Sequence, residues 1–162
     1  MAEKKKKSWL KKLKESKGLP RVAKITGKLT KRWGKGTVAI PAPMEVNEIM
    51  RKVPKGKIIT INEIRKIVAK KHKATIGCPI TCGIFAWISA NAAEEERSGG
   101  KKEITPYWRT LKSDGTLNEK YPGGTKNQKK LLEKEGHKVV QKGKKYLVAD
   151  FQKYLAKLAY KK

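Results

Sequence analysis

Apolar residues recur at intervals of three and four along the middle of the chain, and this spacing places them on one face of a helix. A first amphipathic helix is predicted from about residue 45 until Pro54 and Gly56, which end it. Its apolar positions are Val46, Ile49, Met50 and Val53. Residues 37–40 are predicted to be extended, because Pro41 and Pro43 disfavour helix at the positions before them. The compact part of the chain is therefore expected to begin near residue 44.

A second and a third helix follow with a short break between them. The sequence Thr60-Ile61-Asn62-Glu63 is typical of a capping box, in which a hydroxyl and a carboxylate bond free amides of the first turn. The apolar positions of the second helix are Ile61, Ile64, Ile67 and Val68, and its basic end is Lys70, Lys71, His72 and Lys73. Gly77 interrupts the pattern, and Pro79 suits the start of an apolar third helix that runs to about residue 93. The two helices predict a helix-turn-helix.

The last third of the chain is predicted to alternate turns with short elements. Residues 104–111 are predicted to be extended and residues 126–135 to form a helix. Two apolar runs on either side of Lys142-Gly143 predict a β-hairpin whose basic tip would be a wing. Asp150 is expected to cap a last amphipathic helix, with apolar positions Phe151, Leu155 and Leu158. The expected fold is mainly α with small β-hairpins, an α+β winged helix-turn-helix.

The first 36 residues carry fourteen Lys and Arg against two Glu. Two helical stripes are expected in this part, one after Ser8 and one after Pro20. Their positions are Trp9, Leu10 and Leu13, and then Val22, Ile25 and Leu29. The extension is expected to dock in part, and its first residues are expected to be mobile. We therefore expect a Lys-rich basic extension over residues 1–43 and one winged helix-turn-helix domain over residues 44–162.

The charge of the chain indicates its partner. In 162 residues, 41 Lys and Arg stand against 14 Asp and Glu, which gives a net charge of +27. Such an excess repels itself unless polyanions are near, so nucleic acid is the expected partner, duplex DNA first and structured RNA second. A thermophilic surface would pair Lys with Glu, which is scarce, and a membrane-binding helix would need a broader apolar face.

The sequence contains no apolar run of membrane-spanning length and no secretory signal. We therefore expect no membrane partner and a cytoplasmic protein, associated with the nucleoid if it binds DNA. Cys78 and Cys82 are four residues apart, as on one face of a helix, and with His72 they fall short of the four ligands of a structural zinc site. Structural thiols are the expectation, with no metal, no cofactor and a monomeric state.

Four patterns occur in order between residues 44 and 148. They are Val53-Pro54-Lys55-Gly56-Lys57 followed by Thr60, then Pro106-Tyr107-Trp108-Arg109, then Ser113-Asp114-Gly115 with Tyr121-Pro122-Gly123-Gly124, and finally Leu131-Leu132-Glu133-Lys134-Glu135-Gly136-His137. Together they resemble the DNA-binding domain of the 6-O-alkylguanine-DNA alkyltransferases, which has Pro-Cys-His-Arg at the second pattern. The resemblance implies a winged helix-turn-helix of the alkyltransferase C-terminal type.

The family's chemistry flips a base out of the duplex and passes its alkyl group to a cysteine that a His and a Glu activate through water. Here Tyr107 stands at the cysteine position and Trp108 beside it, and a phenol is a poor acceptor at neutral pH. Glu135 matches the family's buried carboxylate. The chain is therefore most similar in kind to the alkyltransferase-like proteins, which bind alkylated DNA without repairing it. The Arg of the family's recognition helix falls at or near Ile80.

The candidate pocket for a base is formed by Tyr107, Trp108, Arg109, Tyr121 and Glu135, since aromatic faces stack on any base. Alternatively, Tyr107 and Trp108 plug a retired active site, and Glu135 neutralises Arg109. The candidate nucleic-acid contacts are Thr60, Asn62, Lys73, Thr81, Gly83, Asn91, Arg109, Lys112, Lys142, Lys144 and Lys145. The acidic run Glu94-Glu95-Glu96 is expected to point away from the phosphates.

The sequence thus predicts a non-catalytic, alkyltransferase-like protein that binds duplex DNA mainly through phosphates and senses alkylated bases in that pocket. An RNA-binding protein, for example one docked on a ribosome, is the alternative. An active alkyltransferase that uses Cys78 or Cys82 is the least expected, because both thiols lie in the predicted groove helix.

Overall fold

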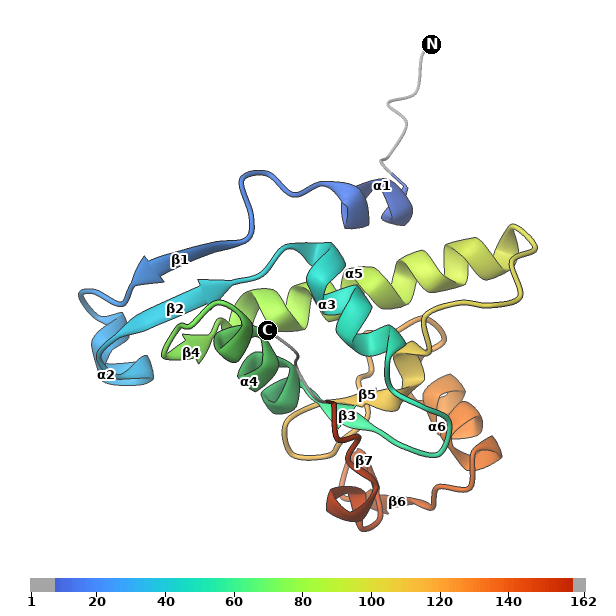
Figure 1. Ribbon diagram of the computed structural model, residues 1–162. Coiled ribbons are helices and arrows are strands. Elements are labelled where there is room, and N and C mark those ends of the chain that lie inside the picture. Colours follow the sequence, from blue (N-terminus) through green and yellow to red (C-terminus); the bar gives the residue numbers. More distant parts are fainter. Residues whose placement is uncertain (1–7, 159–162) are drawn as a thin grey trace.

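The computed structural model describes residues 8–158, which form an α+β fold around one long helix (Figure 1). The helices are α1 (Trp9–Lys14), α2 (Leu29–Trp33), α3 (Pro43–Arg51), α4 (Ile61–Lys71), α5 (Pro79–Ser98) and α6 (Gly124–Lys134), with the 3-10 turns η1 (Tyr107–Arg109) and η2 (Phe151–Tyr154). The strands are β1 (Arg21–Lys24), β2 (Thr37–Ile40), β3 (Ile59–Thr60), β4 (Ile76–Gly77), β5 (Thr110–Leu111), β6 (Val139–Lys142) and β7 (Lys145–Val148). The first residues of the chain, predicted to be mobile, lie outside the described residues. Within that range, no helix is both long enough and apolar enough to span a bilayer.

The two helices of the predicted helix-turn-helix are α4 and α5. The predicted cap of α4 is confirmed, because Thr60 Oγ1 accepts a hydrogen bond from the Glu63 amide at 3.3 Å. The prediction that the next helix ends near residue 93 was wrong, since α5 continues for another turn to Ser98. In that turn Arg97 Nε donates to Glu94 Oε2 at 2.8 Å. A pair of opposite charges three residues apart in sequence stabilises a helix.

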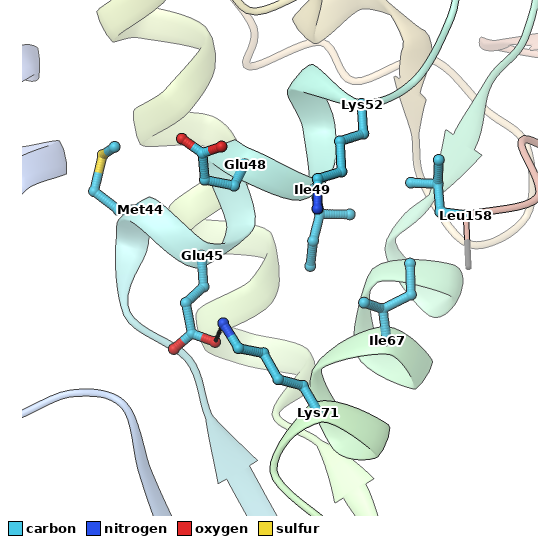
Figure 2. Close-up of a pocket in the computed structure, with 8 residues that line it drawn as sticks. All are labelled: Met44, Glu45, Glu48, Ile49, Lys52, Ile67, Lys71 and Leu158. Carbon is cyan, nitrogen blue, oxygen red and sulfur yellow. Dashed lines mark ion pairs between the residues drawn. The ribbon is translucent and has the colours of Figure 1, made fainter. Parts of the chain in front are cut away.

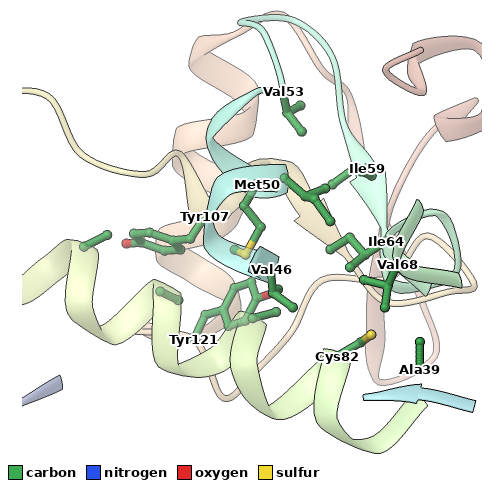
Figure 3. Packing of buried hydrophobic residues seen from close by; sticks show 14 residues of the cluster. Ala39, Val46, Met50, Val53, Ile59, Ile64, Val68, Cys82, Tyr107 and Tyr121 are labelled. Carbon is green, nitrogen blue, oxygen red and sulfur yellow. The ribbon is translucent and has the colours of Figure 1, made fainter. Parts of the chain in front are cut away.

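The main core lies where α3 and α4 pack on α5 (Figure 3). Val46 and Met50 of α3 and Ile64 and Val68 of α4 are completely buried there. The facing side of α5 consists largely of small residues, namely Cys82, Ala86, Ala90 and Ala93. Small side chains let the helices approach closely, so burial of apolar surface holds the helix-turn-helix to the rest of the fold.

The two cysteines belong to the packing, as predicted. Cys78 and Cys82 are both buried and unbridged, and burial raises the pKa of the Cys82 thiol to about 12. Among residues 8–158, no three His, Cys, Asp or Glu side chains come together as potential metal ligands.

The second helical stripe predicted in the N-terminal part was wrong. Arg21–Lys24 forms β1, which pairs antiparallel with β2, and β2 pairs in parallel with β4. In this three-stranded sheet Ile25 is buried beside Val38 and Cys78, whereas Val22 is exposed. Pairing with strands distant in the sequence overrides the local helical spacing.

Two predictions for the C-terminal third also need correction. Residues 104–111 contain η1 and the two-residue strand β5 in place of one extended run. The predicted last helix is only the 3-10 turn η2, and Asp150 has a left-handed backbone with no side-chain cap. After the turn the chain pairs with Ile58. The Ile58 amide donates to the Tyr154 carbonyl, and the Ile58 carbonyl accepts from the Ala156 amide, both at 2.8 Å. This backbone pairing competes with continuation of the helix.

The predicted helix over residues 126–135 is present as α6, and the predicted hairpin is present as β6 and β7. Their buried side chains Leu132 and Val148 form a second cluster with Ile58, Leu111 and Leu117. This smaller core packs the hairpin against α6 and β5.

Candidate nucleic-acid interface

The turn between α4 and α5 holds the second helix in a fixed direction. Arg65 Nε of α4 donates to the Gly77 carbonyl at 2.9 Å. A Cβ on Gly77 would overlap the backbone of Arg65, so a glycine is needed for this close approach. Cys78 is the N-cap of α5, with its sulfur 3.5 Å from the Thr81 amide. The direction of α5 therefore follows from contacts within the turn.

The first two turns of α5 carry an exposed apolar face. Ile80 is 57% exposed and Ile84 is 46% exposed, whereas Cys82 and Ala86 on the opposite side are buried. Open space surrounds Gly83 between them. Two large apolar side chains exposed one turn apart, on the helix that follows the turn, are typical of a contact surface.

A groove of about 700 Å³ runs beside this face. Its lining residues are Ile61, Pro79, Ile80, Gly83, Ile84, Trp87, Lys112, Ser113, Asn118, Glu119 and Lys120. Trp87 Nε1 donates to the Lys120 carbonyl at 3.0 Å, and the Lys112 ammonium lies 2.9 Å from Glu119 Oε2. The structure thus brings two of the predicted nucleic-acid contacts, Gly83 and Lys112, to one groove.

The predicted base pocket is filled by its own side chains. Tyr107 is completely buried and Tyr121 nearly so, and their rings meet edge to face at 5.8 Å. The Tyr107 hydroxyl donates to Glu94 Oε1 at 2.6 Å and accepts from Asn127 Nδ2 at 3.1 Å. Burial, together with the carboxylate of Glu94, raises the pKa of Tyr107. In this structure Tyr107 packs the core, as the alternative prediction has it, and a base would enter only if Tyr107 and Tyr121 moved.

Arg109 and Glu135 form a closely paired, largely buried ion pair, as the alternative prediction expected. Arg109 Nε and a terminal nitrogen of its guanidinium donate to Glu135 at 2.7 to 3.1 Å, and the other terminal nitrogen donates to the Val53 carbonyl at 2.7 Å. Trp108 Nε1 adds a 3.0 Å bond to the same carboxylate. Burial raises the pKa of Glu135, but these hydrogen bonds and the charge of Arg109 outweigh it and hold the pKa below its usual value. In this structure the Arg109 guanidinium is therefore engaged by Glu135 and the Val53 carbonyl.

The other predicted contacts lie in different settings. Thr60 is buried at its cap, and Asn91 Nδ2 donates to the Trp87 carbonyl at 2.9 Å, so both serve the fold. Asn62 is exposed and accepts from Arg65 at 3.2 Å. Lys73 has a left-handed backbone and is exposed in the turn between α4 and α5. Thr81 is half-buried, and its Oγ1 has no hydrogen-bond partner among the described residues. The predicted wing residues Lys142, Lys144 and Lys145 are exposed at the hairpin tip, where Lys145 lies 4.0 Å from Asp114.

The acidic run on α5 turns toward partners within the protein. Glu94 bonds Tyr107, and Glu95 Oε2 accepts from the Trp9 amide at 3.0 Å. Glu96 pairs with Lys101 at 2.6 Å. The Glu95 contact also docks α1 on α5, where the rings of Trp9 and Trp87 meet edge to face at 4.7 Å.

Two residues that organise the site were missed from the sequence. Glu94 lies one helical turn after Ala90 on the core side of α5, so the continued spacing was the available signal. Gln128 of α6 is fully buried, accepts from the Asn118 amide at 2.8 Å and donates to the carbonyls of Trp108 and Thr110. Nothing in its local sequence indicates this role, because its partners are backbone groups of another segment.

A second hollow, of about 210 Å³, lies between α3 and α4 (Figure 2). Its carboxylates are Glu45 and Glu48. Glu45 Oε2 lies 3.0 Å from the Lys71 ammonium and 2.7 Å from His72 Nε2. Burial raises the pKa of Glu45, but hydrogen bonds from His72, the Ala42 amide and Lys71 outweigh it and lower that pKa. Lys52 and Lys71 balance the two carboxylates in this lining, so the hollow has no excess of positive charge to attract phosphates.

Two solved structures share the fold of this chain. S. pombe Atl1 in complex with damaged DNA containing O6-carboxymethylguanine matches it with a TM-score of 0.50 and 21% identity, over 72% of this chain and 94% of that chain. S. pombe ATL in complex with DNA matches with a TM-score of 0.52 and 22% identity over the same shares. No protein-family model matches the chain, and no curated protein is similar to it in sequence. The predicted fold class is confirmed, because the chain is α+β and similar in fold to an alkyltransferase-like protein.

Proposed function

We propose that this chain is a non-catalytic protein that binds duplex DNA against the exposed face of α5 and the groove beside it, mainly through phosphate contacts. The observation that carries the proposal is the exposed pair Ile80 and Ile84 beside Lys112 and Lys120, in a chain of net charge +27. An apolar helix face can press into a groove while surrounding cations neutralise phosphates. The similarity in fold to structures that contain DNA supports this function.

The absence of alkyl transfer is proposed from the state of the candidate acceptors. The Tyr107 phenol is buried and its raised pKa keeps it protonated. The Cys82 thiol is buried with a pKa of about 12, and Cys78 is buried as well. Since the thiolate is the nucleophile, the Cys82 thiol is not activated, and burial keeps the Cys78 sulfur away from a substrate. Incubation with a duplex that contains O6-alkylguanine should add no alkyl mass to the intact protein.

Recognition of an alkylated base is a finer proposal. It requires Tyr107 and Tyr121 to leave the core, because together they fill the predicted pocket. We therefore expect phosphate contact and groove shape to dominate the affinity, with a smaller preference for an alkylated duplex. Titrations of plain duplex DNA, O6-alkylguanine duplex and structured RNA test this order. Tighter binding to the RNA would favour the alternative function.

The direct test is fluorescence anisotropy with labelled duplex DNA. A protein with six to ten phosphate contacts loses about 10³- to 10⁵-fold in affinity between about 50 and about 200 mM salt. Ile80→Glu should weaken binding about tenfold or more, because it places a carboxylate against phosphates. Met44→Glu, at a partly exposed apolar residue that lines the other hollow, is the matched control. Affinity that is flat in salt, or equal losses in both variants, would refute the proposed function.

A further inference from the structure

A basic hairpin projects from the domain beside the helix-turn-helix, and we call residues 21–40 (β1, α2 and β2) the basic arm (Figure 1). Its cations are Arg21, Lys24, Lys28, Lys31, Arg32 and Lys35, and all six are exposed. The sequence has no Asp or Glu between Glu15 and Glu45. None of the six cations pairs with a carboxylate within residues 8–158. The arm therefore concentrates positive charge that the described fold leaves unneutralised.

The basic arm is built onto the turn of the helix-turn-helix. β2 pairs in parallel with β4, which lies inside that turn, so that Val38 is opposite Ile76 and Ala39 opposite Gly77. Ile25, Val38 and Cys78 form a small buried core of their own, against which Trp33 packs. Gly36, at a φ of +126°, lies so close to Thr75 that a Cβ would overlap the Thr75 hydroxyl. A merely solubilising segment needs no such core, whereas a binding element gains from holding its charges in place.

The base of the arm is two residues from the exposed face of α5. The Cys78 amide donates to the Ala39 carbonyl at 2.9 Å, and Ile80 follows Cys78 directly after Pro79. Lys73, exposed in the same turn, continues the positive charge from the arm toward α4. A four-residue strand spans about 13 Å, and each DNA strand carries one phosphate per about 3.4 Å of helix axis. Laid parallel to the helix axis, the arm would therefore pass about four phosphates of one strand beyond its base.

We propose that the basic arm is a second nucleic-acid-binding element, which follows the phosphate backbone of the duplex immediately beyond the segment contacted by α5. This inference rests on the proposed function and adds a site to it. The arm offers cations, with Lys28, Lys31 and Arg32 at its tip, and residues 21–40 contain no Asn, Gln, Asp or Glu, the side chains that read adenine and cytosine edges. It lengthens the contact and raises affinity without reading sequence.

The test compares two variants that each replace four lysines. The arm variant carries Lys24→Gln, Lys28→Gln, Lys31→Gln and Lys35→Gln. The control carries Lys126→Gln, Lys129→Gln, Lys130→Gln and Lys134→Gln on α6, which lies at the other end of the molecule (Figure 1). Both change the net charge equally, and the replaced arm lysines lie outside the buried core of the arm, so thermal melting should show that both variants fold.

Salt titrations with duplex DNA give the first readout. Removal of one phosphate interaction reduces the slope of log affinity against log salt by about 0.9, so the arm variant should be shallower by roughly 2 to 4 and the α6 control by less than about 1. A second readout is the gain in affinity when the duplex grows from about one to about two helical turns. This gain should be large for the unmodified protein and smaller for the arm variant.

The outcomes separate the two proposals. An unchanged slope in the arm variant, or an equal reduction in the α6 control, would overturn the arm as a specific element. If Ile80→Glu abolishes binding while the arm variant keeps its slope, the proposed function stands and this inference fails. If the unmodified protein binds no duplex, both fail.

Discussion

The Tyr107 hydroxyl of η1 donates a 2.6 Å hydrogen bond to Glu94 in the last turns of α5, thirteen residues away in the sequence. This bond joins η1 to α5 across the base pocket that the sequence predicts. Because the tyrosine ring also packs against Tyr121 and Trp108, the residue is part of the core.

The hydroxyl of Tyr107 should contribute measurably to stability. Tyr107→Phe keeps the packing of the ring but leaves Glu94 and Asn127 without this partner, so the free energy of unfolding should fall by about 1 to 2 kcal/mol. Urea denaturation measures the change. Tyr154→Phe, at a more exposed tyrosine, should change it by less than about 0.5 kcal/mol. Equal effects in the two variants would show that the hydroxyl of Tyr107 is not stabilising.

The ion pair between Arg109 and Glu135 should be essential to the fold. Glu135→Gln removes the negative partner of a guanidinium whose side chain is 13% exposed, so the free energy of unfolding should fall by about 3 kcal/mol or more. The pKa of Glu135 is lower in the folded protein than in the unfolded chain, so the unfolded chain takes up a proton first as the pH falls. The stabilisation is therefore present above about pH 4.5 and is lost as the pH falls toward the pKa of the folded protein. Between about pH 3 and about pH 7, the free energy of unfolding should depend more steeply on pH for the unmodified protein than for Glu135→Gln, and denaturation curves measure this.

His137 should make the fold sensitive to mild acid. Its ring is buried against Tyr154, and neither ring nitrogen has a hydrogen-bond partner among residues 8–158. Burial lowers the pKa of His137 below 6.5, so the unfolded chain is protonated first and stability falls as the pH drops through about 6.5. His137→Phe keeps a ring against Tyr154 and should flatten the pH dependence between about pH 7 and about pH 5. A pH dependence that the substitution leaves unaltered would exclude His137 as its origin.

Two glycines should respond in opposite ways to the same substitution. Gly77→Ala places a methyl group against the Arg65 backbone in the turn before α5, so it should destabilise the fold by about 1 to 3 kcal/mol. Gly83→Ala lies inside α5 with open space around it, so it should stabilise the helix by about 0.5 to 1 kcal/mol. Melting temperatures of the two variants provide the comparison. Stabilisation by Gly77→Ala would contradict the close approach seen at the turn.

The sequence by itself determined the elements that depend on neighbours in the chain. The apolar spacing of α3 and α4, the Thr60 cap and the hairpin of β6 and β7 all follow from contacts within a few residues. The same local patterns, in order, indicated the fold class that the comparison with solved structures confirms.

Only the tertiary structure decided three features. These are the strand β1, the shortening of the predicted last helix to the turn η2, and the filling of the predicted base pocket by side chains of the protein. β1 exists because it pairs with β2, which in turn joins β4 in the turn before α5. Arg109 is removed from the surface by Glu135, 26 residues further on, and Tyr107 is closed into the core by Glu94. These outcomes depend on strand pairing and buried charge between distant segments, and the energies of such contacts are set by burial, which local sequence does not encode.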